Sequence, residues 1–143
     1  MLSYAMEASP LVVAFWDGKS HGTKDTIEKC YHLGIEYRVT YYSNEPLKFW
    51  LDDVRPAPEN YILCHSVNEA KRQIVFAEQC GAKIDIIDCD HDLGDYAPDG
   101  GDGIKLIDWL AERKTYYPIE LHAMNPVGRE NMQREVERYW NKE

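Results

Sequence analysis

The feature of this sequence that most constrains its fold is a regular alternation of short apolar runs with segments of helical periodicity. Apolar, β-branched-rich runs predict strands at residues 11–15, 37–42, 49–54, 61–64, 84–89 and 118–123. Helical spacing predicts helices at residues 23–33, 66–80 and 102–113, and a last helix from Val127 or Gly128 to Trp140. This alternation indicates an α/β protein in which helices cover both faces of a mostly parallel sheet, as a three-layer αβα sandwich.

Composition excludes several classes of protein. The chain has 143 residues and a formal net charge of −9 without a Lys/Arg cluster, so a long nucleic acid duplex is not an expected partner. No apolar run approaches the ~20 residues that cross a membrane, and the first residues do not resemble a signal peptide. Cys30, Cys64, Cys80 and Cys89 have irregular spacing, which is typical of buried thiols. We therefore expect a cytoplasmic protein with a small phosphorylated ligand and no membrane partner; a homo-oligomer stays open.

The loop after residues 84–89 concentrates charge. Four aspartates and one histidine fall between Asp88 and Asp95, and Asp90 and Asp92 flank His91. Carboxylates this close raise one another's pKa or recruit a cation, and a carboxylate beside a histidine holds its tautomer. An active site is the favoured interpretation, and a solvated turn rich in aspartate is the alternative.

Two further polar clusters follow predicted strands. Asp52 and Asp53 offer the carboxylates that Mg²⁺ favours, and Arg55 offers a bidentate phosphate contact. The alternative for that cluster is a solvated strand end with an Asp–Arg pair. His122 ends the last predicted strand, and Asn125 and Arg129 follow it at the start of the final helix, where anions bind. Since ligands of parallel sheets bind at the carboxyl ends of the strands, we expect these clusters to converge.

A fourth cluster lies near the N-terminus. Asp17, Gly18, Ser20 and Thr23 form a glycine-containing turn before a helix, which suits a phosphate contact. The spacing differs from that of a Walker A loop, so a simple capped turn is an equal alternative.

From about Phe49 onward the chain resembles the cyclic-phosphate-processing receiver-like domains, a shortened offshoot of the response-regulator receiver fold. The resemblance rests on four segments in order: LDDVRPAP (51–58), DHDLG (90–94), GGDGIKLIDWL (100–110) and HAMNPVGRENM (122–132). It implies a flavodoxin-like sheet, an acidic pocket with two histidines, and activity on cyclic phosphate ends or cyclic nucleotides. It also supports Mg²⁺, because receivers hold this ion with an acidic triad. The chain departs from the family pattern at Ala123, where a serine often stands.

The segment from Ala14 to Cys30 resembles the closing part of SLOG-type nucleotide-binding proteins, in which such a turn meets phosphate or ribose. Residues 1–46 are thus expected to form a SLOG-like βαβ fragment, and residues 47–143 a receiver-like domain. A fragment of this size buries little core alone. We therefore expect its strands to join the sheet of the receiver-like domain in one compact unit.

These observations predict a phosphoesterase that opens or cleaves a cyclic phosphodiester. His91 and His122 are the expected acid–base pair, with Asp90 or Asp92 orienting His91. Arg55, Asn125 and Arg129 are expected to bind the phosphate, and Asp52, Asp53 and Asp90 are a candidate Mg²⁺ site. The alternatives are a module that binds a nucleotide signal without turnover, and a receiver-like domain phosphorylated on Asp90.

Overall fold

The chain divides into two units between Glu45 and Pro46, one residue before the boundary expected from the sequence. The computed structural model describes residues 11–18, 20–41 and 45–141. Within those residues, no helix combines the length and apolar character needed to span a membrane.

The smaller unit is the predicted βαβ segment. It consists of β1 (Leu11–Trp16), α2 (His21–Leu33) and β2 (Glu36–Tyr41), and the two strands pair in parallel. Trp16 and Ile27 are almost fully buried, and α2 ends at Gly34, whose φ of 68° favours glycine. The expectation that these strands join the larger sheet is wrong, because β1 and β2 form a two-stranded sheet of their own.

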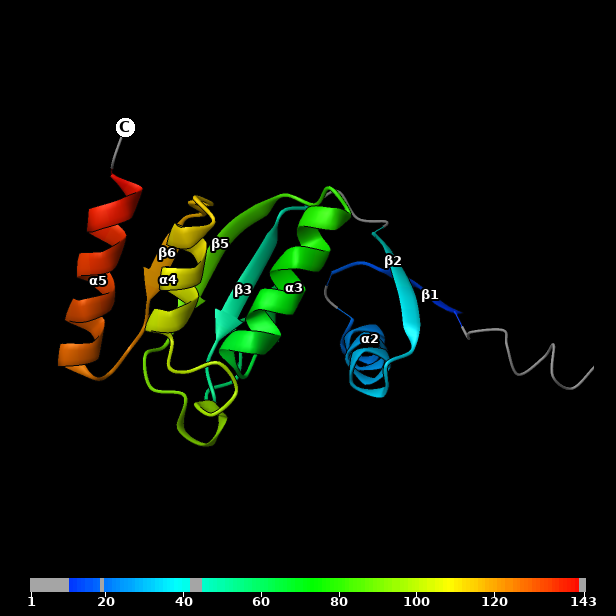
Figure 1. The fold of residues 1–143 in the computed structure, drawn as a ribbon, viewed down its shortest axis with the longest axis horizontal. Helices are drawn as coiled ribbons and strands as arrows, with labels where there is room; N and C mark the ends of the chain where they lie inside the picture. Colours follow the sequence, from blue (N-terminus) through cyan, green and yellow to red (C-terminus); the bar gives the residue numbers. More distant parts are fainter. Residues whose placement is uncertain (1–10, 19, 42–44, 142–143) are drawn as a thin grey trace, which may run out of the picture. The chain divides into compact units, whose positions relative to one another are not determined.

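The larger unit contains a four-stranded parallel sheet with the order β4-β3-β5-β6. Its strands are β3 (Leu47–Leu51), β4 (Tyr61–Cys64), β5 (Ile84–Cys89) and β6 (Ile119–Leu121). Its helices are α3 (Val67–Gln79), α4 (Ile104–Glu112) and α5 (Pro126–Trp140), with the short 3₁₀ helix η1 (Gly94–Tyr96) after β5. The predicted α/β class and receiver-like fold are confirmed (Figure 1).

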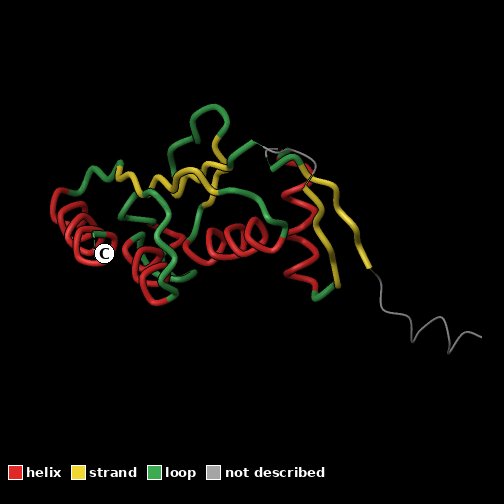
Figure 2. Tube along the Cα trace, turned by 90° about the horizontal axis from the view of Figure 1, so that it is seen from above, coloured by secondary structure: helices red, strands yellow, loops and turns green. Residues whose placement is uncertain are grey.

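This unit has two layers in its described residues, where the sequence suggested three. Figure 2 shows its helices on one side of the strands and a loop on the other. Leu47, Phe49 and Leu51 of β3 are buried on the helix side, whereas Lys48 and Trp50 on the opposite face are half-buried. The reason lies in the connection from β3 to β4, because residues 52–60 cross between these parallel strands without a helix.

Two strands end earlier than predicted, and the difference places the polar residues in loops. β3 ends at Leu51, so Asp52 and Asp53 follow the strand. β6 covers only Ile119–Leu121, so His122 also lies just beyond a strand end.

The order of the strands fixes where a ligand would bind. The chain passes from β3 to β4 on one side and then returns to β5 on the other side of β3. The connections therefore leave β3 and β5 in opposite directions, and ligands of open parallel sheets bind at such a switch point, outside the carboxyl ends of the strands. Asp52 and Asp90 are the first residues after β3 and β5.

Candidate functional site

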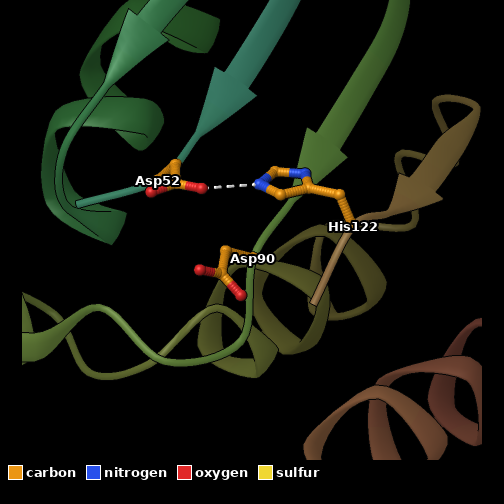
Figure 3. A group of neighbouring side chains, drawn as sticks. All are labelled: Asp52, Asp90 and His122. Carbon is orange, nitrogen blue, oxygen red and sulfur yellow. Dashed lines mark hydrogen bonds and ion pairs between the residues drawn. The ribbon is translucent and has the colours of Figure 1, made fainter. Parts of the chain in front are cut away.

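Three residues that follow neighbouring strands form the centre of the site. The backbone N–H of Asp52 donates to Cys64 O at 3.1 Å, that of Asp90 to Leu51 O at 2.9 Å, and that of His122 to Cys89 O at 3.1 Å. The ladder of the sheet thus continues one residue past each strand and fixes the backbone of all three. Figure 3 shows the Asp52 carboxylate facing the His122 ring, with Asp90 beside them.

Both ring nitrogens of His122 are held by carboxylates. Nδ1 lies 2.6 Å from Asp88 Oδ1, and Nε2 lies 2.9 Å from Asp52 Oδ2. The indole of Trp50 stacks on the imidazole with ring centroids 3.8 Å apart and an interplanar angle of 5°. Trp50 and Asp88 are neighbours in the register of β3 and β5, so the sheet itself presents both to the ring.

The surroundings of His122 favour its protonated form. Burial lowers the pKa of the imidazole, but the hydrogen bonds to Asp88 and Asp52 outweigh this, and the net pKa lies above its usual value. For Asp52, burial raises the pKa of the carboxyl, but the N–H donors of Arg55 and Val54 and the bond to His122 bring it below its usual value. The two carboxylates on either side of the ring therefore favour the imidazolium form of His122.

The negative charge of Asp90 has fewer hydrogen-bond partners than that of Asp52. It is buried, with 7% of the residue exposed, and its Oδ1 accepts the N–H of His91 at 2.7 Å. Its pKa is raised, first because of burial and then because Asp52 lies near, despite the opposing effects of the His91 N–H, His122 and Arg55. A second cation beside Asp90 would relieve this repulsion.

Arg55 lies between the two acidic strand ends. Its Nη1 donates to His122 O at 3.0 Å, while Nε lies 3.5 Å from Asp52 Oδ2 and Nη2 lies 3.8 Å from Asp90 Oδ2. A tight turn sets this position, because Asp52 Oδ1 accepts the N–H groups of Val54 and Arg55 at 2.8 and 2.7 Å. With 40% of its side chain exposed, the guanidinium can also meet an anionic ligand.

His91 belongs to a second group at the same edge of the sheet. Its Nδ1 lies 2.7 Å from Asp92 Oδ1, and Asn125 Nδ2 donates to Asp92 Oδ2 at 3.1 Å. The hydrogen bond from His91 lowers the pKa of the Asp92 carboxyl. The ring lies against Gly128, where any side chain would overlap it. Within the described part of the chain, Nε2 of His91 has no hydrogen-bond partner.

The remaining predicted site residues of the larger unit make other contacts. The Asp53 carboxylate lies beside Gly94 and is not part of the group formed by Asp52, Asp90 and His122. Asn125 is the N-cap of α5, where its Oδ1 accepts the N–H groups of Val127 and Gly128, both at 3.1 Å. Arg129 is exposed on α5 and lines a groove of about 480 Å³ together with Ala123 and Met124.

The N-terminal cluster forms a turn with internal hydrogen bonds. Asp17 Oδ1 accepts the N–H of Ser20 at 2.7 Å, and Thr23 Oγ1 donates to Ser20 Oγ at 3.4 Å. Gly18 has a φ of 81°, which suits this turn, and Ser20 precedes the first turn of α2. These contacts hold the turn together without a side-chain cap on α2, and a ligand contact by Asp17, Gly18, Ser20 or Thr23 stays a prediction.

The sequence interpretation missed two residues of the centre, Asp88 and Trp50. Both are in strands and both point to the face of the sheet that lacks helices, as their register shows. A signal was available for Asp88, because a carboxylate inside the apolar run IDIIDC requires a partner when it is buried. Trp50 carried no such signal, since a tryptophan in a strand is expected in any core.

Comparison with known proteins identifies the family of the larger unit. Residues 47–138 match the family model of the cyclic-phosphate processing receiver domain. The chain belongs to this family. No curated protein and no solved structure gave a match. The SLOG resemblance of the N-terminal segment has no support from these comparisons. The family's description points to a role of this receiver domain in cyclic-phosphate processing.

Two groups in the described part of the receiver domain have the spacing of a metal site. Asp52, Asp90 and His122 each offer one ligand atom, and these atoms lie within 4.8 Å of one another. The second group consists of His91, Asp92 and Asp102. The first group fits a divalent cation, because two buried carboxylates and an imidazole are common metal ligands. It differs from the expected set by containing His122 in place of Asp53.

Proposed function

We propose that the receiver domain hydrolyses the cyclic phosphodiester of a small, nucleotide-like molecule. The observation that supports this most is a repeated arrangement: His91 and His122 each have Nδ1 held by an aspartate, after two neighbouring strands of one sheet. A carboxylate on Nδ1 fixes the imidazole so that Nε2 is the nitrogen that exchanges protons with a substrate.

The two histidines have different parts in this proposal. His91 Nε2, which has no partner among the described residues, accepts a proton from the attacking water. The water oxygen then bonds to phosphorus while the bond from phosphorus to one ring oxygen breaks. In the metal-free protein, the His122 imidazolium gives the leaving oxygen a proton from Nε2, after the substrate has displaced Asp52.

Cationic groups would stabilise the charge on the phosphoryl oxygens. Arg55 lies at the centre of the site with an exposed guanidinium, and Arg129 is exposed near the N-terminus of α5. Asn125 caps α5 through its Oδ1, and its expected phosphate contact stays a prediction. A divalent cation held by Asp52, Asp90 and His122 would act as a Lewis acid at the same oxygens, and Mg²⁺ is the ion expected from the sequence.

The test is incubation of the full chain with 2′,3′-cyclic and 3′,5′-cyclic nucleotides, followed by chromatography of the products. Linear monophosphate formed by the wild type, and lost in His91→Ala, supports the proposal. Binding without product would instead indicate a module that retains a nucleotide signal. Labelling of Asp90 by acetyl phosphate, without hydrolysis of any cyclic nucleotide, would indicate a phosphorylated receiver.

A further inference from the structure

We infer that Asp52, Asp90 and His122 form a site for a transition metal ion such as Mn²⁺ or Zn²⁺, in preference to Mg²⁺, and that Asp88 orients His122 for it. This inference concerns binding alone and does not depend on turnover. The sequence predicted a Mg²⁺ site of three carboxylates, Asp52, Asp53 and Asp90. In the structure a nitrogen of His122 takes the place of the Asp53 carboxylate.

The donor atoms carry the argument on metal identity. Mg²⁺ is a hard ion that is bound by oxygen and retains its water, whereas imidazole nitrogen suits Zn²⁺ and other first-row transition ions. In this site Nε2 of His122 already faces Asp52 Oδ2 at 2.9 Å, with one oxygen of Asp90 within the same group. A cation between these atoms would take the place of the proton that Asp52 and His122 share.

Asp88 holds His122 in the way that carboxylates hold metal-binding histidines. Such a ligand usually donates its other ring N–H to a carboxylate, which fixes the ring and strengthens the metal bond. Asp88 has this position at 2.6 Å from Nδ1, and 7% of the residue is exposed. The stacked Trp50 ring restricts rotation of the imidazole from one side. The ring is thus held ready to bind a metal before any ion arrives.

The balance of charge also favours a divalent ion. Asp52, Asp88 and Asp90 bring three carboxylates to one buried place, and Arg55 supplies one permanent positive charge at 3.5 Å from Asp52 and 3.8 Å from Asp90. A divalent cation bound to neutral His122 would bring the formal charge of this group to zero. Without the ion, neutrality of this group requires a proton on both His122 and one carboxyl.

The second group is a weaker candidate for the same ion. The side chain of Asp92 is 59% exposed, and its oxygens are hydrogen-bonded to His91 and Asn125. Asp102 Oδ1 accepts the N–H of Leu93 at 3.1 Å. These bonds hold the loop together, so we assign the ion to the group with the buried carboxylates of Asp52 and Asp90 and use the second group as the control.

The experiment is titration of the full chain, stripped of metal, with Mn²⁺, Zn²⁺ and Mg²⁺ in a calorimeter. We expect one strong site with an affinity for Mn²⁺ and Zn²⁺ at least about tenfold above that for Mg²⁺. His122→Asn should weaken Mn²⁺ binding by about 10–100-fold, and Asp88→Asn should have a smaller effect in the same direction. Asp53→Asn and His91→Asn are matched controls and should leave the affinity unchanged.

A spectroscopic measurement on the wild type makes the test independent of the folding of any variant. Electron spin-echo spectra of the Mn²⁺-loaded chain should show coupling to a histidine ¹⁴N nucleus. Equal or tighter binding of Mg²⁺, loss of binding in Asp53→Asn or His91→Asn, absence of nitrogen coupling, or no metal binding at all would each overturn the inference. Metal binding without turnover would contradict only the proposed function, and turnover by a chain that binds no metal would contradict only this inference.

Discussion

The two histidines of the receiver domain have the same support and different surroundings. Each has Nδ1 within 2.7 Å of an aspartate oxygen, Asp92 for His91 and Asp88 for His122. His122 is enclosed by Asp52, Asp88 and Trp50, which occupy both nitrogens and one ring face. His91 lies on the loop after β5 against Gly128, with Nε2 unpartnered in the described residues and its partner Asp92 largely exposed.

This difference separates two functions that the sequence presented as one. A histidine whose Nε2 has no partner among the described residues is suited to exchanging protons with a ligand. A histidine whose two nitrogens bind buried carboxylates is suited to holding charge, as an imidazolium or as a metal ligand. In the sequence both histidines follow or end a predicted strand, and only the packing shows that His122 also has aspartate partners.

The largest expected difference between the two sites comes from removal of each imidazole. His122→Ala leaves Asp52 and Asp88 buried without their shared cation, which should cost about 3 kcal/mol of unfolding free energy. His91→Ala should cost less than about 1 kcal/mol, because the Asp92 partner is exposed. If the proposed function is correct, both variants lose about 10²–10⁴-fold in kcat.

Urea unfolding and cyclic nucleotide hydrolysis of the two variants measure these effects side by side. Equal losses of stability would remove the distinction between a charge-holding and a proton-exchanging histidine. An unchanged kcat in His122→Ala would exclude His122 from the mechanism.

A finer comparison removes the negative charge behind each ring. Asp88→Asn places an amide on Nδ1 of His122, which favours the wrong tautomer and leaves less compensation for the buried imidazolium. We expect kcat to fall by about 10–100-fold and stability to fall with it. Asp92→Asn should lower kcat by less than about tenfold and leave the unfolding free energy nearly unchanged, because water reaches that pair. A larger stability loss in Asp92→Asn than in Asp88→Asn would contradict this ordering.

Much of this arrangement could be predicted from the sequence, and what was missed has a physical cause. The alternation of strands and helices predicted the parallel sheet, and the strand-end rule gathered Asp52, Asp90 and His122. Adjacency limited the partner of His91 to Asp90 or Asp92, and the structure shows Asp92. The contact of buried Asp88 with His122 could not be predicted. It depends on the pairing of β5 with β3 and β6, which lie far away in the sequence.

The fold, like the site, could be predicted from the sequence only in part. Pro56 and Pro58 favour a loop between β3 and β4, yet the alternation of strands and helices predicted helices on both faces of the sheet. The βαβ segment was recognised correctly, whereas its assignment to the larger sheet failed. Hydrogen bonding at a strand edge has no signature in the sequence of that strand alone.

A steric substitution tests the placement of His91. In Gly128→Ala the new methyl group would overlap the His91 ring, so the ring or the start of α5 must shift. We expect a loss of about 1–3 kcal/mol in unfolding free energy, together with a fall in kcat if His91 exchanges the proton. His91→Ala removes the obstacle, so the double variant should be more stable than the sum of the single effects predicts. Additive losses in this double-mutant cycle would show that the ring does not lie on Gly128.

The smallest expected effect concerns the packing of the His122 ring. Trp50→Leu removes the stacked surface from His122 but keeps an apolar side chain on the half-buried face of β3. The stacking itself should be worth about 0.5–1.5 kcal/mol, and the ring of His122 should become more mobile while the bonds to Asp88 and Asp52 persist. We therefore expect a modest fall in thermal stability and broadened NMR signals for the His122 imidazole, with the His91 signals unchanged. Equal broadening of both histidines would mean that the two sites move as one. The comparison between an imidazole with both nitrogens bound and one whose Nε2 has no partner in the described residues would then fail.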